Sequence, residues 1–336
     1  MRVGHNPHKD QLLSAPDYLH QVVIPVYIPH QEDYFKDSFR ILQLCINSLV
    51  ATVHAKTCIS IVNNGSCDDV KIYLNELYEQ KLIQELIHTE NIGKLNAVLK
   101  GIAGNAIPLV TIADADVLFL NSWQSETTKI FNQVPQAGVV GIAPQFKMYE
   151  GHCGNVLLAN LFNGKMCFSP VKNQEALIRF YHSIGWDRNY NQDYLKYNLS
   201  LTINPDLKVL IGSGHFVATY KKDVFENIVS YIGYKMGGDS EGYLDKLPLE
   251  KDYWRLTTQD NYAFHMGNVH EDWMVVPAKN ELKVDFPTIN FSKRKPINTV
   301  VYFVKNRLFV KFLSFGWLNT LFLRCKKLPK HMIKRY

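Results

Sequence analysis

The first third of the sequence alternates short, β-branched apolar runs with stretches whose apolar residues recur at helical spacing. The apolar runs end at turn-forming residues and predict four strands, at residues 22–27, 58–62, 86–88 and 109–112. The stretches between the runs predict helices that begin near residues 37, 66 and 94, with Ser66 as the cap of the second helix. Because strands that alternate with helices form a parallel sheet covered on both faces, the sequence predicts an α/β fold.

Three of the predicted strands end in, or are followed by, polar or turn-forming segments. They lie at residues 25–27, 63–65 and 114–116. Ligands of such sheets bind at the carboxyl ends of the strands. We therefore expect these three loops to converge on one site.

Asp114 and Asp116 come directly after the fourth predicted strand, with Ala115 between them. If the chain stays extended, residues i and i+2 point to the same face, and the two carboxylates can share one ligand. A bound cation would relieve their mutual repulsion, so the pair predicts a site for a divalent ion carrying a diphosphate. The alternative is a solvated turn, because Asp is common in turns.

Length and composition are those of a globular protein that can form its own hydrophobic core. The chain has 336 residues, enough for one large domain or two small ones, and 46% of them are hydrophobic. The amino terminus lacks the apolar core of a signal peptide, and no run reaches the ~20 apolar residues of a membrane span. We therefore expect a cytoplasmic protein, peripheral on the inner face of the plasma membrane if its carboxyl-terminal tail binds lipid.

The last part of the chain carries most of the excess positive charge. Residues 293–336 contain twelve Lys and Arg and no Asp or Glu, interleaved with large apolar residues. This composition favours contact with an anionic membrane surface. The alternative is a helix docked on the rest of the protein. Nucleic acid is not expected as a partner, because no base-reading motif accompanies the charge.

Four motifs in this order resemble family 2 glycosyltransferases with the GT-A fold, the nucleotide-diphospho-sugar transferases. They occupy residues 23–27, 62–66, 91–97 and 114–116. The resemblance implies a Rossmann-like, mostly parallel central sheet flanked by helices, with a helical basic and aromatic extension at the carboxyl terminus. Residues 1–285 would form the glycosyltransferase domain, with a nucleotide-sugar half at about 20–145 and an acceptor half at about 146–285. Residues 286–336 would form the extension.

The resemblance also implies how the base of the donor is held. Pro25 and Tyr27 would flank the base, Asn63 would bond its edge, and Asn64 belongs to the same turn. Many relatives have Asp where this chain has Asn63, although an amide oxygen can also accept a hydrogen bond from a base N–H. A UDP-sugar is expected ahead of a GDP- or dTDP-sugar.

For the diphosphate, the resemblance places Lys94 near the nucleotide and Asp114 near ribose or sugar. Asp116 would bind the metal, Mn²⁺ or Mg²⁺. His265 lies beyond the acceptor segment, where many GT-A enzymes have a third metal ligand, and imidazole favours Mn²⁺. The alternative for His265 is a hydrogen-bonded core residue.

Two glycine-containing segments of the second half are candidates for the acceptor side, at residues 211–217 and 236–243. The second resembles the family's acidic segment near the acceptor. On that match Asp239 is the general base, and Glu241 supports the acceptor or replaces it as base. Alternatively, Asp239 caps a helix and Glu241 lies in its first turn.

Together these features predict a metal-dependent glycosyltransferase that transfers a sugar, with inversion, to a hydroxyl of a glycan or lipid-linked acceptor. A sugar nucleotidyltransferase is one alternative, but it should carry a glycine- and basic-rich loop after its first strand, where this chain has residues 25–29. The other is a catalytically silent module that binds a nucleotide-sugar or a glycan.

Overall fold

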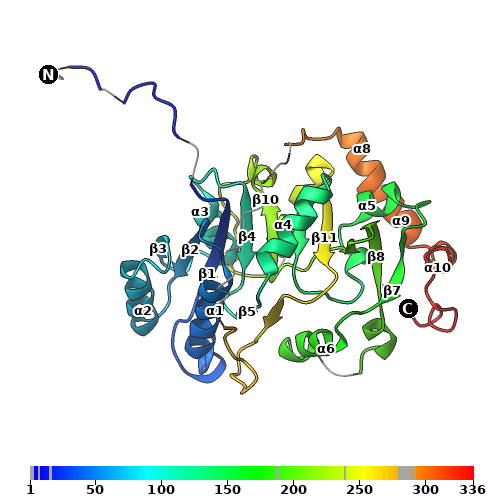
Figure 1. The fold of residues 1–336 in the computed structure, drawn as a ribbon, viewed down its shortest axis with the longest axis horizontal. Coiled ribbons are helices and arrows are strands. Elements are labelled where there is room, and N and C mark those ends of the chain that lie inside the picture. Colours follow the sequence, from blue (N-terminus) through cyan, green and yellow to red (C-terminus); the bar gives the residue numbers. More distant parts are fainter. Residues whose placement is uncertain are drawn as a thin grey trace.

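The computed structural model describes residues 4–6, 8–14, 17–186, 189–237, 240–278, 289, 291 and 293–336, with only the backbone of residues 240 and 241. Its centre is a ten-stranded sheet with the strand order β3-β2-β1-β4-β10-β6-β11-β9-β8-β7. Helices flank this sheet, and a second sheet of two strands, β12 and β5, lies beside it (Figure 1). The predicted α/β class is confirmed.

The first half of the chain follows the predicted alternation. Its elements are β1 (His20–Val26), η1 (Asp33–Phe35), α1 (Ser38–Thr52), β2 (Thr57–Asn64), α2 (Asp68–Glu79), β3 (Glu85–Thr89), α3 (Lys94–Ile102) and β4 (Leu109–Ala113). The four strands pair in parallel. All four strands and three helices predicted from the sequence are therefore present.

The second half extends the sheet. Its elements are β5 (Val117–Phe119), α4 (Trp123–Gln133), β6 (Ala137–Gly141), η2 (Met148–Glu150), α5 (Gly154–Ala159), β7 (Met166–Pro170), α6 (Gln174–Ser183), η3 (Gln192–Leu195), β8 (Tyr197–Asn204), β9 (Leu207–Ile211), β10 (Val217–Lys221), η4 (Lys222–Phe225), α7 (Ser240–Lys246), η5 (Leu247–Lys251), β11 (Trp254–Thr258) and β12 (Ala263–His265). β6 runs in the same direction as β4, because both pair antiparallel with β10. β11 is parallel to β6, and β9, β8 and β7 complete the sheet as antiparallel strands. The carboxyl ends of β1, β2, β4, β6 and β11 consequently share one edge of the sheet.

Alternate residues of β1 explain why this strand reads as a continuous apolar run. Val22 and Ile24 pack in one cluster with Leu42 of α1, whereas Val23 packs in another with Leu95 of α3. Both faces of the strand are therefore buried, as expected for a parallel sheet between helices.

One helix start differs from its prediction. α2 begins at Asp68 with Cys67 as its N-cap, and Ser66 does not cap it. The Ser66 hydroxyl instead accepts a hydrogen bond from the Ile28 N–H and donates one to the Val26 carbonyl. Ser66 thus ties the loop after β2 to the end of β1.

The carboxyl-terminal extension is helical, as expected. It comprises α8 (Thr299–Phe303), η6 (Val304–Leu308), α9 (Phe309–Leu313) and α10 (Gly316–Cys325). η6 is a π-helical turn that joins α8 to α9 in one continuous helix. Figure 1 shows the extension at the β7–β8 end of the molecule, away from β3 and α2.

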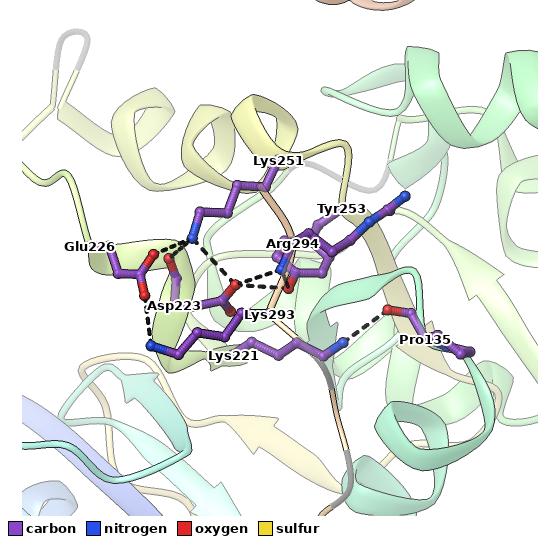
Figure 2. A network of polar contacts seen from close by, with 8 residues as sticks. All are labelled: Pro135, Lys221, Asp223, Glu226, Lys251, Tyr253, Lys293 and Arg294. Atoms are coloured by element: carbon purple, nitrogen blue, oxygen red, sulfur yellow. Dashed lines mark hydrogen bonds and ion pairs between the residues drawn. The ribbon is translucent and has the colours of Figure 1, made fainter. Parts of the chain in front are cut away.

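A network of ion pairs and hydrogen bonds anchors the chain just before α8 (Figure 2). The buried Lys251 ammonium donates to the Asp223 carbonyl at 2.7 Å and to Glu226 Oε2 at 2.6 Å. Lys293 reaches Glu226 Oε1 at 2.9 Å, and the Arg294 N–H donates to the Tyr253 hydroxyl. The chain that leads into α8 is thereby fixed to η4, η5 and β11.

Candidate functional site

The turn after β2 is organised by its own side chains. Asn63 is buried, accepts the Ser66 N–H at 3.0 Å, and lies 3.0 Å from His88 Nδ1 through Nδ2. Asn64 is also buried, and its Oδ1 accepts the Ile92 N–H at 2.9 Å. Asn63 and Asn64, both predicted to bind the sugar nucleotide, therefore also hold the neighbouring loops in place.

The loop after β1 presents one of its two predicted residues at the surface. Pro25 is buried within the strand, while Tyr27 is 41% exposed beyond its end. The Tyr27 ring meets Phe35 edge-on at 6.0 Å. Of this pair, Tyr27 is the side chain that a ligand at the carboxyl edge of the sheet could reach.

Two tight backbone approaches place Lys94 at the first turn of α3. Gly93 has φ +91°, and a Cβ there would lie 2.7 Å from the Tyr234 carbonyl oxygen, so only glycine fits. The Lys94 N–H donates to the Lys235 carbonyl at 2.8 Å. The segment that precedes the predicted acceptor residues is thus held against the start of α3.

Lys94 and Asp114 form an ion pair, with 2.6 Å between Nζ and Oδ1. Both side chains are partly exposed, at 34% and 22%. The pair joins the start of α3 to the end of β4. It gives the site a positive group fixed beside a negative one.

The chain does not stay extended between the two aspartates, because a turn at Ala115 and Asp116 separates β4 from β5. Asp116 consequently has a different neighbour from Asp114. Its Oδ2 lies 3.3 Å from His265 Nε2. The antiparallel pairing of β5 with β12 produces this contact, since it sets His265 opposite Val117.

His265 is held from its other side. Its Nδ1 lies 2.9 Å from the Ser183 hydroxyl at the end of α6, and its ring meets Phe216 edge-on at 5.3 Å. Because Nδ1 is hydrogen-bonded to Ser183, the imidazole ring is oriented with Nε2 towards Asp116. Nothing in the sequence indicated Ser183, because its contact depends on how α6 packs on β12.

The surroundings of Asp116 fit a bound divalent ion. Its Oδ1 is buried and accepts no hydrogen bond from any residue that the structure describes. Burial raises the pKa of Asp116 above its usual range, opposed by His265 and reinforced by Asp114. A carboxylate desolvated next to an imidazole matches the ligand chemistry of Mn²⁺ or Mg²⁺.

This site offers few protein ligands. Across the described ranges, no three His, Cys, Asp or Glu side chains gather as a candidate metal cluster. Asp116 and His265 would therefore supply only part of an ion's ligands, and the rest would have to come from water and a diphosphate.

The predicted acceptor residues are only partly visible. Asp239 lies outside the described residues, and Glu241 is described only as the second residue of α7. Leu244 of α7 packs in one cluster with Leu95 and Val98 of α3. Lys94, His215 and Met236 line one pocket together with Leu95 and Leu244. The start of α7 is thus close to the Lys94 side of the site.

The structure also brings His215 to this edge, together with two partners that the sequence did not indicate. His215 Nδ1 lies 3.7 Å from Asp245 Oδ2, and the buried Arg255 holds Asp245 Oδ1 at 2.5 Å. Burial alone would raise the pKa of Asp245, but the His215 hydrogen bond and the Arg255 charge outweigh it and lower that pKa. The three residues come from the loop before β10, from α7 and from β11, so no spacing in the sequence relates them.

Comparison with known proteins gives one family and a few distant structures. A model of the family described as glycosyl transferase family 2 matches residues 22–228. The structure of S. aureus TarS has 10% sequence identity and a TM-score of 0.43, covering 74% of this chain and 36% of TarS. TarS 1–349 in complex with UDP-GlcNAc has 13% identity and a TM-score of 0.42, covering 75% of this chain and 61% of that one. No curated protein matches the sequence.

Proposed function

The chain belongs to glycosyl transferase family 2, and from this premise we propose that it transfers a sugar from a nucleoside-diphosphate sugar to a hydroxyl of a glycan or lipid-linked acceptor. The observation that supports this most is the contact of Asp116 with His265 at the carboxyl end of β4. Parallel sheets bind their ligands at this edge. The Lys94–Asp114 pair and the loops after β1 and β2 lie at the same edge.

On the donor side, we assign the base to the loops of Tyr27 and Asn63, and the diphosphate to the region of Lys94 and Asp116. Lys94 supplies a positive charge that Asp114 holds in place. A UDP-sugar is the first donor to test, ahead of GDP- and dTDP-sugars.

Asp116 and His265 are the proposed ligands of Mn²⁺ or Mg²⁺. When bound, such an ion supplies Lewis-acid stabilisation of the negative charge that develops on a departing diphosphate. Ser183 keeps His265 Nε2 directed at the site. The unbonded Oδ1 of Asp116 remains available as a ligand atom.

On the acceptor side, we propose Asp239 as the general base, with Glu241 supporting the acceptor. The Asp239 carboxylate takes the proton of the acceptor hydroxyl as the hydroxyl oxygen attacks the anomeric carbon. The bond from that carbon to the diphosphate breaks in the same step, and the nucleoside diphosphate leaves. A single in-line displacement of this kind inverts the anomeric configuration.

The deciding experiment incubates the purified protein with Mn²⁺ and a panel of UDP-, GDP- and dTDP-sugars and measures the nucleoside diphosphate released by slow hydrolysis. Release with one donor, lost in Asp116→Asn, supports the proposal. Binding without release for every donor would indicate a silent module. Formation of pyrophosphate from a nucleoside triphosphate and a sugar phosphate would indicate a nucleotidyltransferase.

A further inference from the structure

The helix formed by α8, η6 and α9 is fixed to the protein along one side. The Lys305 ammonium pairs with Asp252 Oδ2 at 2.5 Å, and Asn306 Oδ1 accepts the Asn155 N–H at 3.2 Å. Gly154 lets α5 come close, since a Cβ there would meet the Lys305 carbonyl oxygen at 2.4 Å. The rotation of the helix about its axis is therefore set by specific contacts.

The opposite side of this helix points away from the protein and is largely apolar. Its exposed residues are Val300, Val301, Phe303, Val304, Arg307, Leu308, Lys311 and Phe312. Phe303 is 54% exposed and Phe312 is 50% exposed. Apolar groups continue beyond the helix, where Trp317 is 70% and Leu321 is 51% exposed. A solvent-exposed apolar surface of this extent indicates a partner that covers it.

We propose that this outer side, Val300–Phe312 with Phe315, Trp317 and Leu321, lies on an anionic lipid bilayer. Charge identifies the partner, because residues 293–336 carry twelve basic and no acidic residues. Arg307 and Lys311 are exposed among the apolar residues of the surface itself. Large apolar residues that enter the headgroup layer, with basic residues beside them, are the combination that binds anionic lipid.

The shape of the extension suits a bilayer surface. Among the described residues no single helix is long and apolar enough to cross a membrane. Thr299–Leu313 and Gly316–Cys325 reach that length and apolarity only together, and they are bent by 97°. Lys305 and Asn306 are also tied to the protein on the inner side. The extension therefore lies on the lipid as a bent pair.

The position of this surface also says how the enzyme would face the membrane. Asp252, which holds Lys305, precedes β11 and so lies at the amino ends of the parallel strands. Asp114 and Asp116 lie at their carboxyl ends. The contact would tether the protein at the edge of the sheet opposite the proposed donor site. It stands independently of the proposed function.

The test is flotation of the full-length protein with vesicles of phosphatidylcholine alone or mixed with phosphatidylserine, at low and high salt. We expect binding to the mixed vesicles that high salt weakens. Arg307→Gln with Lys311→Gln should weaken binding about 25-fold, at roughly fivefold for each charge. Leu308→Glu with Phe312→Glu should abolish it. The matched control is Ile72→Glu with Tyr78→Glu on α2, where both residues are exposed. It adds the same two negative charges away from the proposed surface, so it should retain binding that Leu308→Glu with Phe312→Glu loses.

Each other outcome overturns the proposal. Wild-type protein that stays unbound, or that binds neutral vesicles equally at both salt concentrations, rules out anionic lipid. A dimer in sedimentation that Leu308→Glu with Phe312→Glu dissociates would assign the surface to a second copy of the chain. Circular dichroism of each variant ensures that lost binding is not lost folding.

Discussion

His265 Nε2 lies 3.3 Å from Asp116 Oδ2, and the pairing of β12 with β5 fixes that separation. Asp116 precedes β5 and His265 ends β12, so the smaller sheet positions both side chains in the site. Any change that shifts this register would separate the two proposed metal ligands.

Asp116→Asn should abolish metal-dependent donor binding while the fold stays intact, because the substitution removes the charge that holds the ion. Calorimetric titration of the proposed donor with and without Mn²⁺ measures the effect, and circular dichroism checks the fold. Asp206→Asn in an exposed turn is the control. Donor affinity of the wild type that EDTA leaves unchanged would contradict the metal assignment.

Ser183→Ala should weaken Mn²⁺ binding about 10- to 100-fold, the range typical of residues that orient a metal-binding histidine. The hydroxyl contacts His265 Nδ1 at 2.9 Å and has no other proposed role in the site. Titration of Mn²⁺ in the presence of UDP measures the affinity. Ser125→Ala is the matched control, since its hydroxyl donates a local hydrogen bond to the Ser122 carbonyl just before α4, at 2.8 Å. Equal affinities for the two variants would remove Ser183 from the site.

The sequence predicted the sheet because its signal is local. Val22, Val23 and Ile24 show that both faces of β1 are buried, and the turn residues after each strand mark the edge where a ligand binds. The predicted start of α2 was wrong because the competing contacts of Ser66 are not local in sequence. Ser66 has two backbone partners, Val26 at the end of β1 and Ile28 in the loop after it, and these compete with a cap.

The site could be predicted only where a motif is contiguous or where the family resemblance reached. Asp114 and Asp116 are separated by one residue, whereas their partners Lys94 and His265 lie far from them in the sequence. The resemblance placed both partners in the site and assigned Asp116 and His265 to one metal ion, but it did not predict the Lys94–Asp114 ion pair. Asp245 and Arg255 had neither kind of signal, because their contact with each other and with His215 depends on packing between α7, β11 and a loop.

Asp239→Asn should lower turnover about 10²- to 10⁴-fold, the range for loss of a general base, and leave donor affinity nearly unchanged. Initial rates with acceptor and equilibrium binding of the donor separate the two effects. Glu241→Gln is the comparison, because it should cost less if Glu241 only supports the acceptor. A larger loss in Glu241→Gln than in Asp239→Asn would exchange their roles.

Glu226→Gln should reduce the free energy of unfolding near neutral pH by less than about 1 kcal/mol, since the side chain is 43% exposed and solvent screens its ion pairs. Hydrogen bonds from Lys251 and then Lys293 lower the pKa of Glu226 from 4.5 to about 2. Because the pKa of Glu226 is lower in the folded state than in the unfolded state, its charge stabilises the fold fully at pH values above the unfolded-state pKa. This contribution disappears as the pH falls from about 4.5 towards 2. Denaturant unfolding of wild type and variant across this range should therefore converge at low pH.

The control for that series is Glu79→Gln at the exposed end of α2, which should not show this convergence. A difference between wild type and Glu226→Gln that stays constant down to pH ~2 would mean that the charge of Glu226 does not stabilise the network.

Two neighbouring leucines of α10 should differ sharply in their effect on stability. Leu323 is 2% exposed and belongs to a buried cluster that also contains residues of β8 and β9, whereas Leu321 is 51% exposed. Leu323→Ala should cost about 2–5 kcal/mol of unfolding free energy through the cavity it leaves, and Leu321→Ala should stay within about 0.5 kcal/mol of the wild type. Chemical denaturation of both variants measures this. Equal, small effects would show that α10 does not belong to the core, whereas the expected contrast means that deleting the whole extension also removes core contacts and so does not test membrane binding by itself.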